Sequence, residues 1–149
     1  ITNASLNEKV ELAKVLHVSN IKLNPIDVRR GGAKEKETTK ARKVDLLRIQ
    51  FDIDKNLIDE AGNKDLYIKV IDPKGELLSN PALGSGSFIT ADGNTEFYSI
   101  SKRVMLEKQE AISGVTVDWN QSAEYESGEY LVEIFHKGHV IGKQKVTLK

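Results

Sequence analysis

The C-terminal stretch Tyr125–Lys149 reads YESGEYLVEIFHKGHVIGKQKVTLK, and it decides the fold. Apolar and polar residues alternate on both sides of Lys137-Gly138, and alternation with a period of two is typical of a half-buried β-strand. A short pair ending in glycine between two such runs predicts a β-hairpin. The core face predicted for this hairpin consists of Tyr130, Val132, Ile134, Val140, Val146 and Leu148.

The same alternation recurs upstream, for example in Leu47–Ile53, where the intervening residues are polar. Turn signals separate the runs, and Asp72-Pro73-Lys74-Gly75 has the residue order of a type I turn. The phase slips at Ser19-Asn20 and at Asn24-Pro25, which indicates a β-bulge or a strand that changes sheets. The sequence therefore predicts an all-β fold, an antiparallel sandwich or barrel of about seven to nine strands.

The N-terminal segment has a different pattern. Ser5-Leu6-Asn7-Glu8 fits a capping box, and Leu6, Val10 and Ala13 share one helical face. We expect a short helix within residues 1–14, either a cap on the domain or the end of an upstream stalk or coiled coil. Residues 15–149 form the predicted β-sandwich domain.

Composition limits the class of protein. The chain has 149 residues, 22 basic and 22 acidic, so its formal net charge is zero and no strong overall attraction to nucleic acid is expected. It contains no cysteine, and no apolar run reaches the roughly 20 residues that span a bilayer. It begins at Ile1 and its one methionine is Met105, so we expect a processed chain or part of a longer protein, with any membrane anchor upstream.

The run Glu126-Ser127-Gly128-Glu129-Tyr130-Leu131-Val132 resembles the tyrosine corner of immunoglobulin-like domains. Gly128 and Tyr130 occupy the positions of the corner glycine and tyrosine, and Val132 stands where antibody domains have a cysteine. The final hairpin is similar to those that close C-terminal ectodomains of bacterial cell-envelope and surface proteins. The resemblance implies an immunoglobulin-like sandwich, located in the periplasm or on the cell surface, that acts as a structural or protein-interaction module.

Two groups of residues have weak signals for metal binding. His136 and His139 flank the predicted turn, but two ligands are too few for zinc. Asp52 and Asp54 begin a pattern that resembles a calcium loop, yet Leu57 stands at the position that requires glycine. We therefore assign no metal and no cofactor, and interpret these side chains as polar residues of a turn and of a strand's solvent face.

The segment from Arg29 to Lys43 is the most distinctive polar stretch, with seven basic and two acidic residues. It fits a solvated loop between two strands, or a contact surface for a polyanion such as acidic polysaccharide, lipid headgroups or nucleic acid. Nucleic acid is the least favoured, because no aromatic residue is interleaved for stacking. The acidic stretch 107–133 adds the option of self-association. The candidate contacts are Arg29, Arg30, Lys34, Lys36, Lys40, Arg42 and Lys43.

Aromatic residues supply a third hypothesis. Trp119 and Tyr125 are candidate sugar contacts. Trp119 shares the parity of Val115 and Val117 and so favours the core, whereas Tyr125 lies on a predicted loop, where we expect it to be exposed. No nucleophile and base are spaced as a hydrolase requires, and "LGSGSF" does not match G-x-S-x-G. The sequence thus favours a non-enzymatic interaction module, with carbohydrate binding and polyanion binding as alternatives.

Overall fold

A computed structural model of the chain describes residues 16–29, 32–54, 62–90, 92–106, 111–121 and 124–149. These residues form ten strands: β1 (Val18–Arg29), β2 (Lys34–Glu37), β3 (Leu46–Ile53), β4 (Gly62–Ile71), β5 (Gly86–Ile89), β6 (Thr95–Tyr98), β7 (Ile100–Leu106), β8 (Ile112–Trp119), β9 (Gly128–His136) and β10 (His139–Leu148). Two single-turn 3₁₀ helices, η2 (Ala41–Lys43) and η3 (Pro81–Leu83), lie in the connections.

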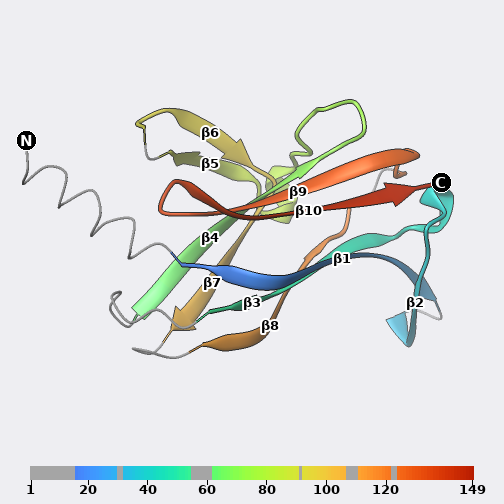
Figure 1. The fold of residues 1–149 in the computed structure, drawn as a ribbon. Helices are drawn as coiled ribbons and strands as arrows, with labels where there is room; N and C mark the ends of the chain where they lie inside the picture. The colour runs from blue at the N-terminus through green and yellow to red at the C-terminus, as the bar shows by residue number, and fades with distance from the viewer. Residues whose placement is uncertain (1–15, 30–31, 55–61, 91, 107–110, 122–123) are drawn as a thin grey trace, which may run out of the picture.

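The strands form two four-stranded antiparallel sheets and one separate hairpin (Figure 1). The first sheet has the order β2-β1-β3-β8 and the second has the order β10-β9-β4-β7. β5 and β6 pair only with each other. The fold is therefore an all-β antiparallel sandwich, as the sequence predicted.

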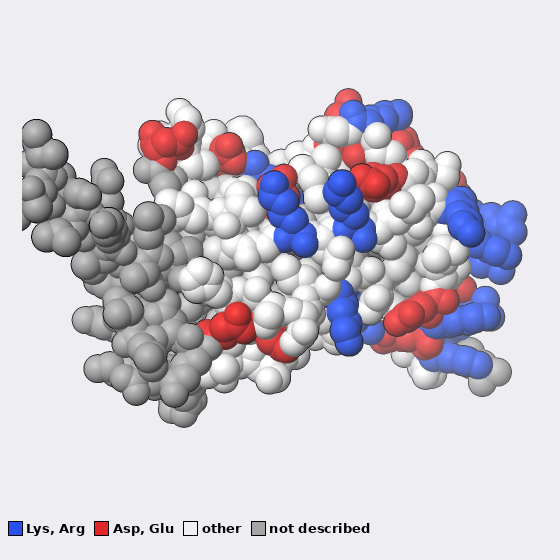
Figure 2. All heavy atoms as spheres, viewed as in Figure 1, with Lys and Arg blue, Asp and Glu red and all other residues white. Residues whose placement is uncertain are grey.

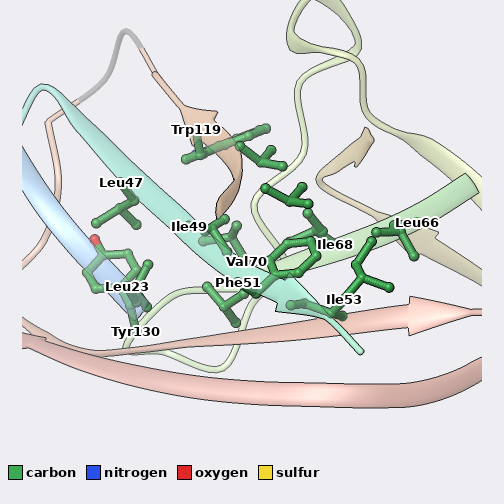
Figure 3. Packing of buried hydrophobic residues seen from close by; sticks show 14 of the residues in the cluster. Leu23, Leu47, Ile49, Phe51, Ile53, Leu66, Ile68, Val70, Trp119 and Tyr130 are labelled. Carbon is green, nitrogen blue, oxygen red and sulfur yellow. The ribbon is translucent and has the colours of Figure 1, made fainter. Parts of the chain in front are cut away.

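The core lies between the two large sheets (Figure 3). Alternate residues of β3 meet alternate residues of β4, and Ile49, Ile53, Ile68 and Val70 have no exposed surface. Strands of this kind gain stability from apolar area removed from water, about 25 cal/mol per Å². Trp119 is 1% exposed, so its predicted place in the core is confirmed.

β1 contains the bulge that the sequence predicted at Ser19-Asn20. Its register with β3 shifts between Ser19 and Lys22, and Asn20 has φ 52°, a left-handed conformation that asparagine tolerates. The interpretation was wrong at Asn24-Pro25, where pairing with β3 continues without a shift. The break in alternation there has another cause, because Ile26 and its partner Leu46 are buried on the opposite face of the sheet from Leu47.

The last hairpin is present, with Lys137 at φ 51° and Gly138 at φ 78° in a two-residue turn. Two consecutive positive φ angles are those of a type I′ turn, whose twist matches the flanking strands. The predicted core face is right for β9 but wrong at Val140, which is 45% exposed. The register shifts between Val140 and Gly142, and this bulge turns Val140 out of the core.

The described residues hold ten strands instead of seven to nine, because short β2, β5 and β6 carry too few residues for a clear alternating pattern. The segment 29–43 is not one loop, since β2 pairs with β1 and η2 follows. The helix expected near the N-terminus, and the boundary at residue 14, lie outside the described residues.

Candidate functional site

The β5–β6 hairpin lies on the outer face of the second sheet and is attached to it by aromatic rings. The ring of Phe88 stacks on Tyr67 of β4 with centroids 5.1 Å apart and an interplanar angle of 10°. It also meets Phe135 of β9 at 5.1 Å, while Tyr98 meets Tyr67 at 4.8 Å. Burial raises the pKa of Tyr67 above its ordinary value, because its phenolate is poorly solvated there.

A charged pair joins the hairpin to the same sheet. Lys69 of β4 pairs with Glu96 of β6, and its Nζ lies 5.1 Å from the centroid of the Phe135 ring. Such a cation over an aromatic face adds to the attraction between the two elements. A groove of about 460 Å³ runs beside this pair, bounded on the far side by Val140. The hairpin is therefore a fixed projection, held by both apolar and ionic contacts.

The other face of the hairpin exposes two large apolar side chains. Ile89 is 69% exposed and Phe97 is 63% exposed. Ile89 pairs with Thr95, and Ser87 pairs with Phe97, so the two apolar side chains are diagonal neighbours on one face of the hairpin. Adjacent exposed apolar side chains of this size mark contact surfaces more often than isolated ones do.

The predicted cationic residues gather at one end of the sandwich, where β2 and the C-terminal end of β10 lie (Figures 1 and 2). The basic residues on β2 and η2 are exposed. Arg29 is paired with Asp27, with 3.0 Å from Nε to Oδ2, and Arg30 lies outside the described residues. Lys149, which the sequence analysis missed, joins this end because its carbonyl accepts a hydrogen bond from Ala41 N–H at 2.9 Å.

The sugar-contact hypothesis loses its two aromatic residues. The exposure expected for Tyr125 was wrong: only 4% of the residue is exposed, and its hydroxyl donates a 2.7 Å hydrogen bond to the carbonyl of Trp119. This burial also raises the tyrosine pKa. The indole N–H of Trp119 donates to Gln121 at 3.0 Å. Because both rings lie in the core, neither presents a face on which a sugar could stack.

The two histidines form a cross-strand pair beside the turn. His136 was expected at an exposed turn, but it is 3% exposed and its Nδ1 accepts a hydrogen bond from Leu16 N–H at 3.0 Å. Its parity with Ile134 directs it inward, which the sequence pattern could have shown. Across the described ranges, no group of three or more His, Asp or Glu side chains is arranged to hold a metal ion.

Asp52 and Asp54 bind neighbouring strands. Asp52 Oδ2 accepts from Asn20 Nδ2 at 2.8 Å, and its Oδ1 accepts from Gly114 N–H at 2.9 Å. Asp54 Oδ1 accepts from the hydroxyl of Ser19 at 2.6 Å. These carboxylates fix the bulge of β1 against β3 and β8, which is a structural role.

The start of β9 has the geometry of a corner. The hydroxyl of Tyr130 accepts a 2.8 Å hydrogen bond from the backbone N–H of Glu126. Gly128 has φ 129°, and a Cβ at that position would lie 2.6 Å from Cβ of Pro73. Glycine is therefore required at this position by both its backbone conformation and the close approach of the Asp72–Gly75 turn.

Two solved structures resemble this fold. Alkylpurine DNA glycosylase AlkC of Pseudomonas fluorescens, bound to DNA containing an abasic site analogue, matches with TM-score 0.52 and 9% identity over 94% of this chain and 32% of that chain. β-Glucosidase 3B of Thermotoga neapolitana, in complex with α-D-glucose, matches with TM-score 0.53 and 14% identity over 90% of this chain and 16% of that chain. This chain thus spans a third or less of either protein, and the likeness concerns the fold alone.

In the part of the chain that the structure describes, no helix has the length and apolarity needed to cross a membrane. Among proteins of curated function, none matches this chain. A family model matches residues 19–149, which include every strand of both sheets and the separate hairpin except for the first residue of β1. The chain therefore belongs to the family described as a domain of unknown function, DUF8428.

Proposed function

We propose that this domain is a non-enzymatic protein-interaction module of a bacterial cell-envelope protein, and that it meets its partner with the outer face of the β5–β6 hairpin. The observation that carries the proposal is the pair of neighbouring side chains Ile89 and Phe97, 69% and 63% exposed on a fixed hairpin. Interface cores are enriched in aromatic and apolar side chains of this kind.

The attachment of the hairpin supports this role. Phe88, Tyr98 and Glu96 hold its inner face to β4 and β9, so the outer face does not have to be ordered when a partner binds. Preorganisation of this kind lowers the entropic cost of association. The two similar structures are also consistent with a module, because this fold makes up 32% and 16% of those longer chains. The envelope location rests on the resemblance of the last hairpin, and the immunoglobulin-like class rests on the resemblance of the run from Glu126 to Val132 to a tyrosine corner.

Site-specific photo-crosslinking in the native cell tests the proposal. A photoactivatable phenylalanine analogue replaces Phe97 in the full-length chain, and a matched variant carries it at Lys22, which is exposed on the first sheet. We expect a discrete cross-linked adduct from position 97 and none from position 22. The analogue placed at Ser87, on the same face, should also give an adduct. That adduct should disappear when the Ser87 analogue is combined with I89T and F97T. Equal adducts from positions 97 and 22, or none from the hairpin, would refute the hairpin as the contact surface.

A further inference from the structure

The cationic end of the sandwich holds basic side chains that form no ion pair with the residues that the structure describes. Of the described residues there, Asp27 is paired with Arg29 and Glu35 with Arg48, and Asp45 accepts from the backbone N–H of Val28 at 2.7 Å. The local carboxylates are thus largely engaged. Six exposed basic side chains make no ion pair with another described residue: Lys34, Lys36, Lys40, Arg42, Lys43 and Lys149.

Three of these cations line one pocket. A hollow of about 450 Å³ is bounded by Lys40, Arg42 and Lys149, together with Glu124, Tyr125 and Ser127. The backbone beneath it is fixed, because Ala41 N–H donates to Lys149 O at 2.9 Å and Lys149 N–H donates to Thr39 O at 2.6 Å. These bonds hold η2 against the end of β10. The cations therefore come from segments far apart in sequence and are brought together by the fold.

We propose that this pocket and the adjoining basic residues of β2 bind a linear anionic polysaccharide that carries carboxylate groups. The pocket supplies three cations, one hydroxyl donor in Ser127 and the wall of a buried ring, a combination that suits a carboxylate attached to a polar sugar. This surface lies on β2 and η2, so the proposal is independent of the hairpin contact.

The spacing of charges favours a polysaccharide over nucleic acid. DNA carries one negative charge per about 1.7 Å of helix axis, and its partners present dense positive surfaces. Here Glu35 and Glu37 are interleaved with Lys34 and Lys36, so the positive charge is sparse. Single-stranded nucleic acid also needs exposed aromatic rings, whereas Tyr125 is 4% exposed. A polymer with one carboxylate in each repeating unit matches separated cations better.

The surface also lacks what a membrane contact requires. The exposed large hydrophobic residues of the described ranges are Ile89, Phe97, Met105 and Val140, and they belong to β5, β6, β7 and β10 outside the pocket lining. A basic surface without an apolar wedge gives only weak, headgroup-dependent attraction to lipid. This surface therefore suits a polysaccharide better than a lipid membrane.

Calorimetric titration with a polygalacturonate oligomer tests the proposal. We expect binding that weakens steeply as salt rises, and K40Q/R42Q should weaken it about tenfold or more, since charge-assisted contacts are lost. The matched control K22Q/K102Q removes the same charge from elsewhere and should leave affinity within about twofold. Glu124 places a carboxylate in the pocket lining, so E124Q should strengthen binding.

Several outcomes would overturn the proposal. They are equal losses in K40Q/R42Q and K22Q/K102Q, no gain in E124Q, salt-independent binding, or no binding of polygalacturonate. Tighter binding of a single-stranded oligonucleotide, or of vesicles containing anionic lipid, would also overturn it in favour of those ligands. Thermal unfolding of each variant shows whether a loss of binding comes from a loss of fold.

Discussion

Single residues in this protein connect segments that the sequence pattern treats separately. Alternation places Asp52 on the outward face of its strand, and that prediction is consistent with its exposed carboxylate. Its two partners, Asn20 and Gly114, are 32 and 62 residues away in sequence. Strand register brings them together, and register cannot be read from one strand's pattern. For this reason, the interpretation of Asp52 as a simple solvent-facing residue missed its role in fixing the bulge.

The acid limb of the stability curve should depend on Asp52. Hydrogen bonds from Asn20 and from Gly114 N–H hold the pKa of its carboxyl below the ordinary 3.8. Because the pKa of Asp52 is lower in the folded state, its ionised carboxylate contributes to the free energy of unfolding. This contribution is fully present above the unfolded pKa and is lost as pH falls through the folded pKa. D52N should therefore unfold at a lower urea concentration than the wild type at neutral pH. The difference should shrink from about pH 4 to about pH 2.

Urea midpoints measured by fluorescence across this pH range check that expectation. E76Q alters a single exposed carboxylate in a turn away from β1 and serves as the control. If the difference in urea midpoint between D52N and the wild type stayed constant down to about pH 2, Asp52 would not titrate as described.

At the scale of elements, long strands with regular alternation were predictable and short ones were not. β3, β4 and β9 follow their patterns, whereas β5 and β6 have four residues each. The β5–β6 hairpin depends on Tyr67 and Phe135, side chains on the outward face of another sheet. An outward aromatic residue in an alternating strand is the sequence signal that could have indicated a covered face. The candidate contact surface was missed because it lies on this hairpin.

The β5–β6 hairpin should open separately from the sandwich when its anchor is removed. Phe88 is 7% exposed and contacts two rings of the sheet, those of Tyr67 and Phe135, so F88A leaves a cavity between hairpin and sheet. We expect amide hydrogen exchange to accelerate in residues 86–98 while the central strands β4 and β9 stay protected, because local openings cost less than global unfolding.

F97A removes a ring of the same size from the exposed face and should leave exchange in this hairpin unchanged. If F88A accelerated exchange equally in β3, β4 and β9, the hairpin would be part of the global folding unit instead.

At the scale of the whole molecule, one edge of the sandwich forms a seam between β10 of the second sheet and β1 of the first. β10 passes close to β1, and a Cβ on Gly142 would lie 2.5 Å from Cδ1 of Ile21 and 2.7 Å from Cγ2 of Val18. Gln144 Nε2 also donates to the carbonyl of Ile21 at 2.9 Å. The sequence could predict a two-sheet sandwich from its apolar patterns, but not which strands form this seam, because the seam depends on bulges in both strands.

A larger side chain at the seam should weaken both sheets together. G142V forces β1 away from β10, and overpacking of this kind costs about 1–3 kcal/mol. The free energy of unfolding should fall by that amount whether it is followed by far-UV circular dichroism or by fluorescence of Trp119, which lies in the first sheet on β8. Thr147, exposed on the same strand, provides the control T147V. Two separate transitions in G142V would contradict cooperative unfolding of the sheets.

The bond between Leu16 N–H and His136 Nδ1 has a consequence for the order in which the chain is made. Its partners are 120 residues apart, so at a synthesis rate of about 5–20 residues per second the first strand emerges about 6–24 seconds before its acceptor exists. During that interval β1 can pair with β2 and β3 of its own sheet, but its apolar face is not yet covered by β9 and β10 of the second sheet. The newborn chain therefore needs protection of this apolar face until β9 and β10 arrive, and the sandwich forms after synthesis of its last strand.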